Sequence, residues 1–281
     1  VNTVNEDDLV LMVETGHFAS LWNKMALKLG IKTEFLETDW RRGVEPEKLF
    51  DRLKKDIDKK IKAVCVVHNE TSTGSISRIK EVREAINSAK HNALLMVDSI
   101  SGLASLEYKH DEWGVDVTVS GSQKGLMLPP GLSFNAISEK ALFASNENSM
   151  KRSYWDWKEQ IQSNKQGSFP YTPATNLLYG LKEAIDMLHE EGLENVFKRH
   201  ERHAQATRVA VQAWGLEVLC QEERDYSSVL TAVKLPEGHN ADGLRKIILE
   251  QFNMSLGNGL SKLAGKVSVS YTHLRAHETF A

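Results

Sequence analysis

The chain has 281 residues, of which 41% are hydrophobic and 26% are charged, with a formal net charge of −3. This size and composition are sufficient for one large domain or two smaller ones, and the charge gives no basis for binding nucleic acid or an anionic membrane. The sequence contains no apolar stretch of 18 residues, so we expect no transmembrane helix.

Cysteine usage and the first residues indicate an interior compartment. Cys65 and Cys220 are too few for a disulfide framework, and Cys65 stands inside an apolar run. The first 13 residues are acidic before they are apolar, which is wrong for a signal or transit peptide. They include no initiating Met and enter a strand pattern at once. We therefore expect a chain that starts inside a domain and works in a reducing compartment.

Strand and helix patterns alternate through the first third of the chain. Short apolar runs predict strands at 9–13, 33–36, 63–67 and 93–97. Apolar residues at helical spacing predict helices before Gly30, from Pro46 and from Ile79. In the second helix, Leu49, Leu53 and Ile57 repeat every four residues on one face. This order predicts an α/β fold with a parallel sheet and right-handed crossovers.

Two neighbouring apolar runs end in residues with useful chemistry. The run 93–97 is closed by Asp98, and the run 115–119 leads through Ser-Gly-Ser-Gln to Lys124. In an open parallel sheet the ligand lies outside the carboxyl ends of the strands, so both side chains should meet at one crevice. A further strand at 132–137 would lie beside the lysine strand.

The composition changes after residue 150. Aromatic residues among polar neighbours predict a loop and a short helix near 154–157, and two prolines predict a non-helical link at 167–173. Two long helices follow, one ending near Gly192 and one running to about Trp214, with Val209 among its apolar positions. A strand at 229–233 and a helix near 244–248 complete a second, α+β domain.

An acid and a lysine that face each other across a crevice suit pyridoxal 5′-phosphate (PLP). The lysine amine bonds to the cofactor aldehyde, and the carboxylate pairs with the pyridinium nitrogen. The alternative is a pair of ordinary loop residues, a solvated Lys124 and a turn-forming Asp98. Spacing alone favours that alternative, so the surrounding residues decide.

Three ordered motifs resemble those of the class V aminotransferases. They are His-Asn-Glu-Thr-Ser-Thr-Gly at 68–74, Val-Asp-Ser-Ile-Ser at 97–101, and Ser-Gly-Ser-Gln-Lys-Gly-Leu at 120–126 followed by Pro-Pro-Gly at 129–131. The segments 111–116, 190–195 and 255–260 are similar to the serine–glyoxylate and alanine–glyoxylate subgroup. The resemblance extends from about Leu9 to Val267.

The resemblance implies the type I fold of PLP-dependent transferases and transfer of an amino group from serine or alanine to glyoxylate. The products would be glycine and a keto acid. Lys124 would hold PLP and move the substrate proton, and Asp98 would keep the pyridine nitrogen protonated. The resemblance also implies a protein of the peroxisome or the cytoplasm that takes part in glyoxylate metabolism and photorespiration.

Five further residues match cofactor-side positions of the family. Gln123 and Thr71 would hydrogen-bond the phosphate and the ring-hydroxyl side of PLP. Ile100 would lie against one ring face and Phe18 against the other, although a lone aromatic side chain is more often part of a core. Thr172 would reach the phosphate of a neighbouring subunit in a homodimer, or else lie in an ordinary proline-bounded linker.

Two family features are missing, so we expect a chain that is incomplete at both ends. One is the glycine-rich loop that holds the phosphate, and the other is the arginine that binds the substrate carboxylate. Arg275 is not at the matching place. We expect a large PLP-binding domain at 1–169, a small domain at 170–267 and an unrelated tail at 268–281.

Other functions remain open. A truncated and catalytically incompetent chain, or a pseudoenzyme, is the main alternative. A cysteine desulfurase would have histidine where Gln123 stands, together with a mobile catalytic cysteine. A nicotinamide-binding Rossmann enzyme lacks its glycine fingerprint here. We expect no metal, because His68 has no second histidine at ligand spacing.

Overall fold

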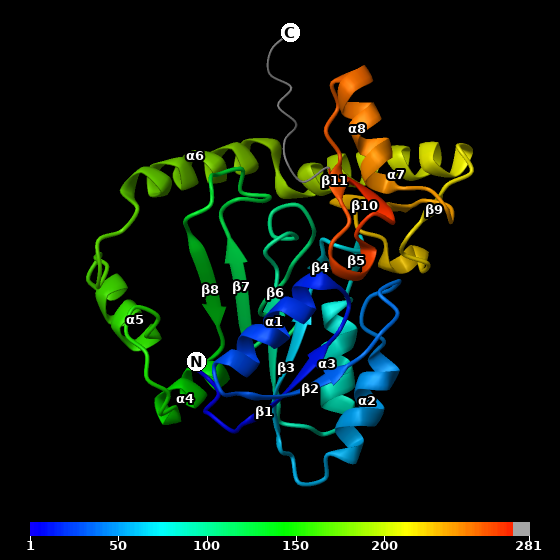
Figure 1. Cartoon of the computed structure of the whole chain (residues 1–281). Helices are drawn as coiled ribbons and strands as arrows, with labels where there is room; N and C mark the ends of the chain where they lie inside the picture. The colour runs from blue at the N-terminus through cyan, green and yellow to red at the C-terminus, as the bar shows by residue number, and fades with distance from the viewer. Residues whose placement is uncertain (272–281) are drawn as a thin grey trace.

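The computed structural model describes residues 1–271, and a six-stranded sheet forms its centre (Figure 1). The strand order is β2-β1-β3-β6-β7-β8. The strands are β1 (Leu9–Val13), β2 (Lys32–Leu36), β3 (Ile61–Val67), β6 (Leu94–Asp98), β7 (Val117–Gly121) and β8 (Ser133–Ile137). The first five are parallel and β8 is antiparallel to β7. The predicted α/β class and mainly parallel sheet are confirmed.

Helices cover both faces of this sheet because its strands carry apolar side chains on both. In β1, Leu11 and Val13 pack with α2 (Pro46–Lys55) and α3 (Ile79–Ser88) in one buried cluster. The alternate residues Val10 and Met12 pack with α1 (His17–Lys28) in another. Period-two alternation therefore supplies both layers from one strand.

The apolar face that the sequence predicts for α2 is wrong at one position. Leu49 and Leu53 of α2 are fully buried, but Ile57 is 85% exposed. The helix ends at Lys55, and the residue after it leaves helical geometry, with φ −85° and ψ 66° at Asp56. Ile57 therefore lies beyond the end of the helix, and its four-residue spacing from Leu53 no longer places it on the buried face.

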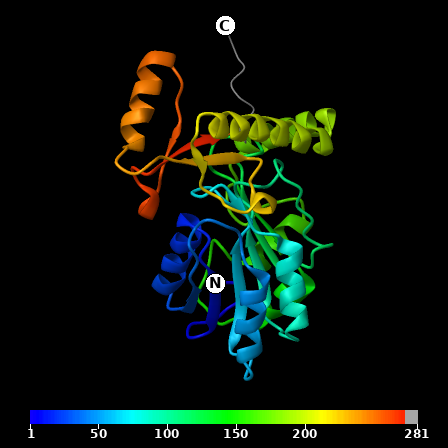
Figure 2. The ribbon, with the colours of Figure 1, turned by 90° about the vertical axis from the view of Figure 1, so that its right-hand side faces the viewer.

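The second half contains a smaller antiparallel sheet and most of the remaining helices (Figure 2). The helices are α4 (Glu139–Glu147), α5 (Trp157–Lys165), α6 (Thr175–Glu191), α7 (Leu193–Ala213) and α8 (Ala241–Phe252), with 3-10 turns η1 (Glu223–Asp225) and η2 (Ser261–Leu263). The sheet contains β9 (Glu217–Val218), β10 (Leu230–Lys234), β11 (Gly257–Asn258) and β12 (Val267–Tyr271). The domain boundary that we expect near residue 170 falls in the link between α5 and α6 and stays a prediction.

Two further expectations concern this half. In α7, Val196 and Ala204 are buried, but the expected apolar position Val209 is 58% exposed, since it lies on the outer face of the helix. Residues 268–271 of the expected tail pair with β10 as part of β12, whereas residues 272–281, including Arg275, lie outside the described residues.

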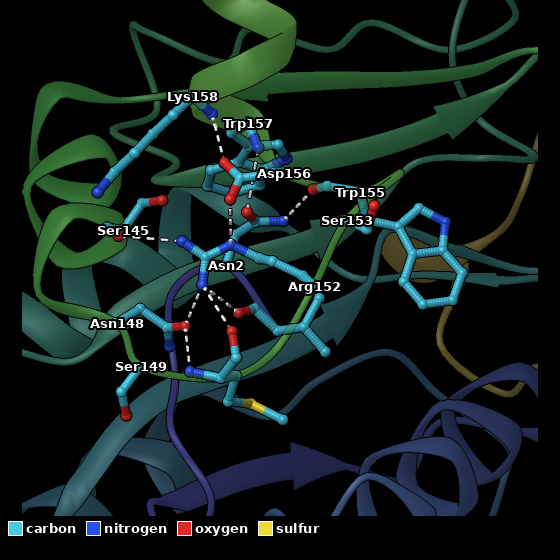
Figure 3. A network of polar contacts seen from close by, with 12 residues as sticks. Asn2, Ser145, Asn148, Ser149, Arg152, Ser153, Trp155, Asp156, Trp157 and Lys158 are labelled. Carbon is cyan, nitrogen blue, oxygen red and sulfur yellow. Dashed lines mark hydrogen bonds and ion pairs between the residues drawn. The ribbon is translucent and has the colours of Figure 1, made fainter. Parts of the chain in front are cut away.

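The start of the chain is joined to the segment before α5 by a polar network (Figure 3). The Arg152 guanidinium donates to the carbonyl oxygens of Val1 and Ser145 at 3.4 and 3.3 Å. The Asn2 side chain donates to the Trp155 carbonyl at 2.8 Å and accepts from the Trp157 N–H at 3.2 Å. This network anchors the segment that leads to Thr172.

α6 crosses above the carboxyl end of β7 in Figure 1. Leu126 and Leu128, which follow Lys124, form a buried cluster with Ala184 and Leu188 of α6. The lysine loop is therefore fixed from above by a helix of the second half. None of the helices in residues 1–271 is both long enough and apolar enough to cross a membrane.

Candidate active site

Four loops meet at the carboxyl edge of the parallel strands. They follow β1, β3, β6 and β7, which all run in the same direction. The His68 N–H donates to the Asp98 carbonyl at 2.8 Å, and a Cβ on Gly125 would lie 2.2 Å from the carbonyl oxygen of Leu103. The loops after Asp98 and around Lys124 are thus in direct contact, as the strand ends predict.

Asp98 is the last residue of β6, and its carboxyl group has no cationic partner within residues 1–271. Its Oδ1 accepts the Ile100 N–H at 2.8 Å. Burial raises the pKa of Asp98 to about 6; the Ile100 N–H opposes this shift, and the nearby charge of Glu70 adds to it. The site therefore holds an acceptor that a buried N–H cation would satisfy.

Lys124 lies three residues beyond β7, half-buried in a tight loop. The Lys124 carbonyl accepts the Met127 N–H at 2.8 Å, and the Ser122 hydroxyl donates to the Pro129 carbonyl at 2.7 Å. Burial lowers the pKa of the Lys124 ammonium. Its Nζ forms no hydrogen bond or ion pair with any residue from 1 to 271, so the amine is free to react.

Other predicted residues surround this pair. Phe18 lies in the first turn of α1 and is partly buried, as is Ile100. Thr71 is buried in the turn between β4 (Asn69–Glu70) and β5 (Ser75–Ile76). The Gln123 side chain folds back over the end of β7, where a Cβ on Gly121 would lie 2.7 Å from its Oε1. Their contacts with a cofactor stay predictions.

Thr172 lies apart from this cluster. It is exposed and belongs to the link between α5 and α6, and Figure 1 shows this link beyond the edge strand β8. The preceding Tyr171 shares a 2.9 Å hydrogen bond with Ser153 and packs 5.1 Å from the Tyr154 ring. Among the described residues, no hydrogen bond joins Thr172 to Lys124 within one chain.

Our sequence interpretation gave no role to Glu70, Ser72 or Tyr108. Glu70 is fully buried behind α1, and the rings of His68 and Tyr108 lie 5.1 Å apart. Burial lowers the pKa of His68 to about 4, so it is neutral, and no group of three metal-binding side chains occurs within residues 1–271. The sequence signal that could have pointed to these residues is the run of polar residues directly after the buried strand β3.

These side chains fit PLP. The pyridinium N–H needs a buried acceptor, which Asp98 offers, and the aldehyde needs a free amine, which Lys124 offers. A planar ring also needs apolar surfaces, and Phe18 in the first turn of α1 and Ile100 in the loop after β6 lie at the same edge of the sheet. The residues at this edge therefore include an acceptor for the ring nitrogen and an amine for the aldehyde.

A mainly parallel sheet with this acid and lysine at its carboxyl edge is the architecture of the fold type I PLP-dependent enzymes. Residues 1–274 match the family Aminotransferase class-V, and the chain belongs to this family. The predicted fold and family are both confirmed.

Relatives and solved structures agree with this assignment. The chain is 48% identical to the serine–glyoxylate aminotransferase of Hyphomicrobium methylovorum, covering 95% of this chain and 66% of that protein. It is 40% identical to the L-aspartate–glyoxylate aminotransferase of Paracoccus denitrificans, covering 95% and 67%. An alanine–glyoxylate aminotransferase from Nostoc sp. superimposes with a TM-score of 0.86 at 28% identity, covering 98% of this chain and 72% of that one. The chain thus spans about two thirds of the length of the curated relatives it matches.

Proposed function

We propose that this protein is a PLP-dependent aminotransferase that moves an amino group from serine or alanine to glyoxylate. The products are glycine and the keto acid of the donor. One observation carries the proposal: a partly buried carboxyl group without a cation, Asp98, and a free half-buried amine, Lys124, lie on contacting segments at one sheet edge.

The acceptor is proposed from the relatives. The relatives from Hyphomicrobium and Paracoccus are named for different amino donors, serine and L-aspartate, but both are named for glyoxylate. Glyoxylate as the amino acceptor is therefore better supported than any single amino donor. Serine takes precedence among donors because the more similar of the two relatives is named for it.

Lys124 performs the proton transfer. Burial lowers the pKa of its ammonium, so more of the residue is present as neutral amine near pH 7. With PLP bound, Nζ would take the proton from the substrate Cα and deliver it to the former aldehyde carbon of the cofactor, so that one group would act first as general base and then as general acid. The bound cofactor supplies the electron sink that makes this proton acidic.

Asp98 accepts the N–H of the cofactor ring and keeps that nitrogen protonated. Its Oδ1 is oriented by the Ile100 N–H, which leaves Oδ2 for the ring. Phe18 and Ile100 close the two ring faces and exclude water. Gln123 and Thr71 hydrogen-bond the polar substituents of the cofactor.

A homodimer completes the site in this proposal. Thr172 is exposed beside Tyr154, Trp155 and Tyr171, which are 67%, 65% and 41% exposed. Exposed aromatic side chains gathered in one region mark protein–protein contact surfaces. Thr172 would then reach the phosphate in the site of the second subunit.

A donor panel tests the reaction. Purified protein with PLP and glyoxylate is supplied with serine, alanine or aspartate, and glycine formation is measured. We expect serine to give the highest kcat/KM. Glycine formation from none of the three donors, with PLP bound, would refute glyoxylate transamination by this chain and leave the incompetent alternative.

A further inference from the structure

Glu70 is a fully buried carboxylate at the centre of a hydrogen-bond cluster. It lies in β4, directly before Thr71. Its Oε1 accepts the Phe18 N–H at 3.3 Å, the Ser72 N–H at 3.1 Å and the Ser72 hydroxyl at 2.7 Å. Its Oε2 accepts the Ala19 N–H at 3.2 Å. Burial raises the pKa of Glu70, whereas these four bonds, in which every partner donates, stabilise the ionised carboxylate and oppose that shift.

These bonds supply a cap that α1 lacks in its own sequence. The first N–H groups of a helix have no partner inside the helix, and Gly16 at the N-cap has no side chain to offer. Glu70 takes two of these donors, and the Ser72 hydroxyl accepts a third, from His17, at 2.9 Å. A negative charge at this end also interacts favourably with the helix dipole.

The backbone before α1 approaches this cluster so closely that only glycine fits. A Cβ on Gly16 would lie 2.4 Å from the Glu70 Cγ and 2.4 Å from the Ser72 Oγ. The loop after β1 and the loop after β3 are therefore joined by direct contact as well as by hydrogen bonds.

We propose that Glu70 is a positioning residue, whose carboxylate locks the turn of α1 that carries Phe18 to the loop that carries Thr71. The inference rests on the proposed function, in which Phe18 contacts a face of the cofactor ring and Thr71 contacts its polar substituents. Glu70 itself touches neither substrate nor cofactor. It sets the spacing between two of the surfaces that receive the ring.

Asp56 provides a matched control at the opposite edge of the sheet. It is also a buried carboxylate, and it accepts the Ile61 N–H at 2.8 Å and contacts the His91 ring at 3.1 Å. Ile61 begins β3, whereas Glu70 follows the end of the same strand. The variant Asp56→Asn therefore removes a buried charge with similar partners, far from the site.

The experiment compares Glu70→Gln with Asp56→Asn by amide hydrogen exchange without cofactor and by PLP titration. In Glu70→Gln an amide NH₂ faces an N–H donor, so we expect exchange at Phe18 and Ala19 to rise about tenfold and PLP affinity to fall about tenfold. Asp56→Asn should lower thermal stability and leave PLP affinity within about twofold. Ser72→Ala, which removes one donor to Glu70, should shift both quantities in the same direction by less.

Three results would overturn the inference. They are unchanged exchange in Glu70→Gln, increased exchange with unchanged PLP affinity, and equal loss of PLP affinity in Asp56→Asn. If Glu70→Gln does not fold, Ser72→Ala decides by the same criteria. Failure of the unaltered protein to bind PLP would end the proposed function separately, and amide exchange would still decide whether Glu70 fixes the start of α1.

Discussion

At the residue scale, the ionised Asp98 side chain lowers the stability of the cofactor-free protein. Its proposed role as acceptor for the cofactor ring explains why such a group is present. Its carboxylate is largely removed from water, with one N–H donor and no cation among the described residues, and the pKa of Asp98 is raised to about 6. Groups kept in unfavourable surroundings are common at active sites, where the missing partner arrives with the ligand. Glu70 is also buried, but protein donors satisfy it.

The raised pKa predicts a stability change in Asp98→Asn. The folded state holds the Asp98 proton more tightly than the unfolded state, so this group contributes stability at low pH that is lost as pH rises from about 4 through about 6. Without cofactor, Asp98→Asn should therefore be more stable than the unaltered protein at pH 7.5, by about 1–2 kcal/mol. The difference should vanish near pH 3.5.

Denaturant unfolding at both pH values measures this effect, with aminotransfer measured in parallel. Activity should fall at least ~100-fold in Asp98→Asn, because the ring nitrogen loses its anionic partner. A variant that is less stable at pH 7.5 would show that Asp98 is a structural group rather than an acceptor awaiting a ligand.

At the element scale, the contact between the loops after β6 and β7 decides where Lys124 lies. Gly125 is the point of closest approach, since a Cβ there would lie 2.2 Å from the Leu103 carbonyl and 2.5 Å from the Ser105 hydroxyl. The lysine is positioned by this packing and by the cluster under α6.

Gly125→Ala should therefore displace Lys124 and lower kcat about 100-fold, because misplacement by about 1 Å has effects of that size. Gly243→Ala is the matched control in α8, where the nearest atom to a new Cβ is 4.0 Å away, and it should leave kcat unchanged. Steady-state kinetics at saturating PLP measures both. Equal kcat values for the two variants would contradict the positioning role of the loop contact.

The sequence predicts the elements that depend on local pattern and misses what depends on contacts distant in the chain. Strands ending at Val13, Val67 and Asp98 follow from apolar runs, so the meeting of their loops was predictable from parallel topology. Ile57 was mispredicted because periodicity does not show where a helix ends. Glu70 was missed because its partners in α1 are about 50 residues away.

At the scale of the whole molecule, the exposed aromatic residues around the link between α5 and α6 predict a subunit interface. We expect the protein to have twice the chain mass in solution and the double variant Tyr154→Ser, Trp155→Ser to shift toward the monomer. Trp214→Ser is the control, since Trp214 is 72% exposed at the end of α7. Light scattering coupled to gel filtration measures the masses, and a monomeric unaltered protein would contradict the shared site.

The central claim is that Asp98 and Lys124 form a PLP site in this chain, and the absorbance spectrum tests it most directly. Purified protein with added PLP should show a band at roughly 400–430 nm. Borohydride should fix the cofactor covalently, and peptide mapping should find it on Lys124. Lys124→Ala should lose both the band and the covalent label. A folded protein without the band, or a label retained in Lys124→Ala, would contradict the account.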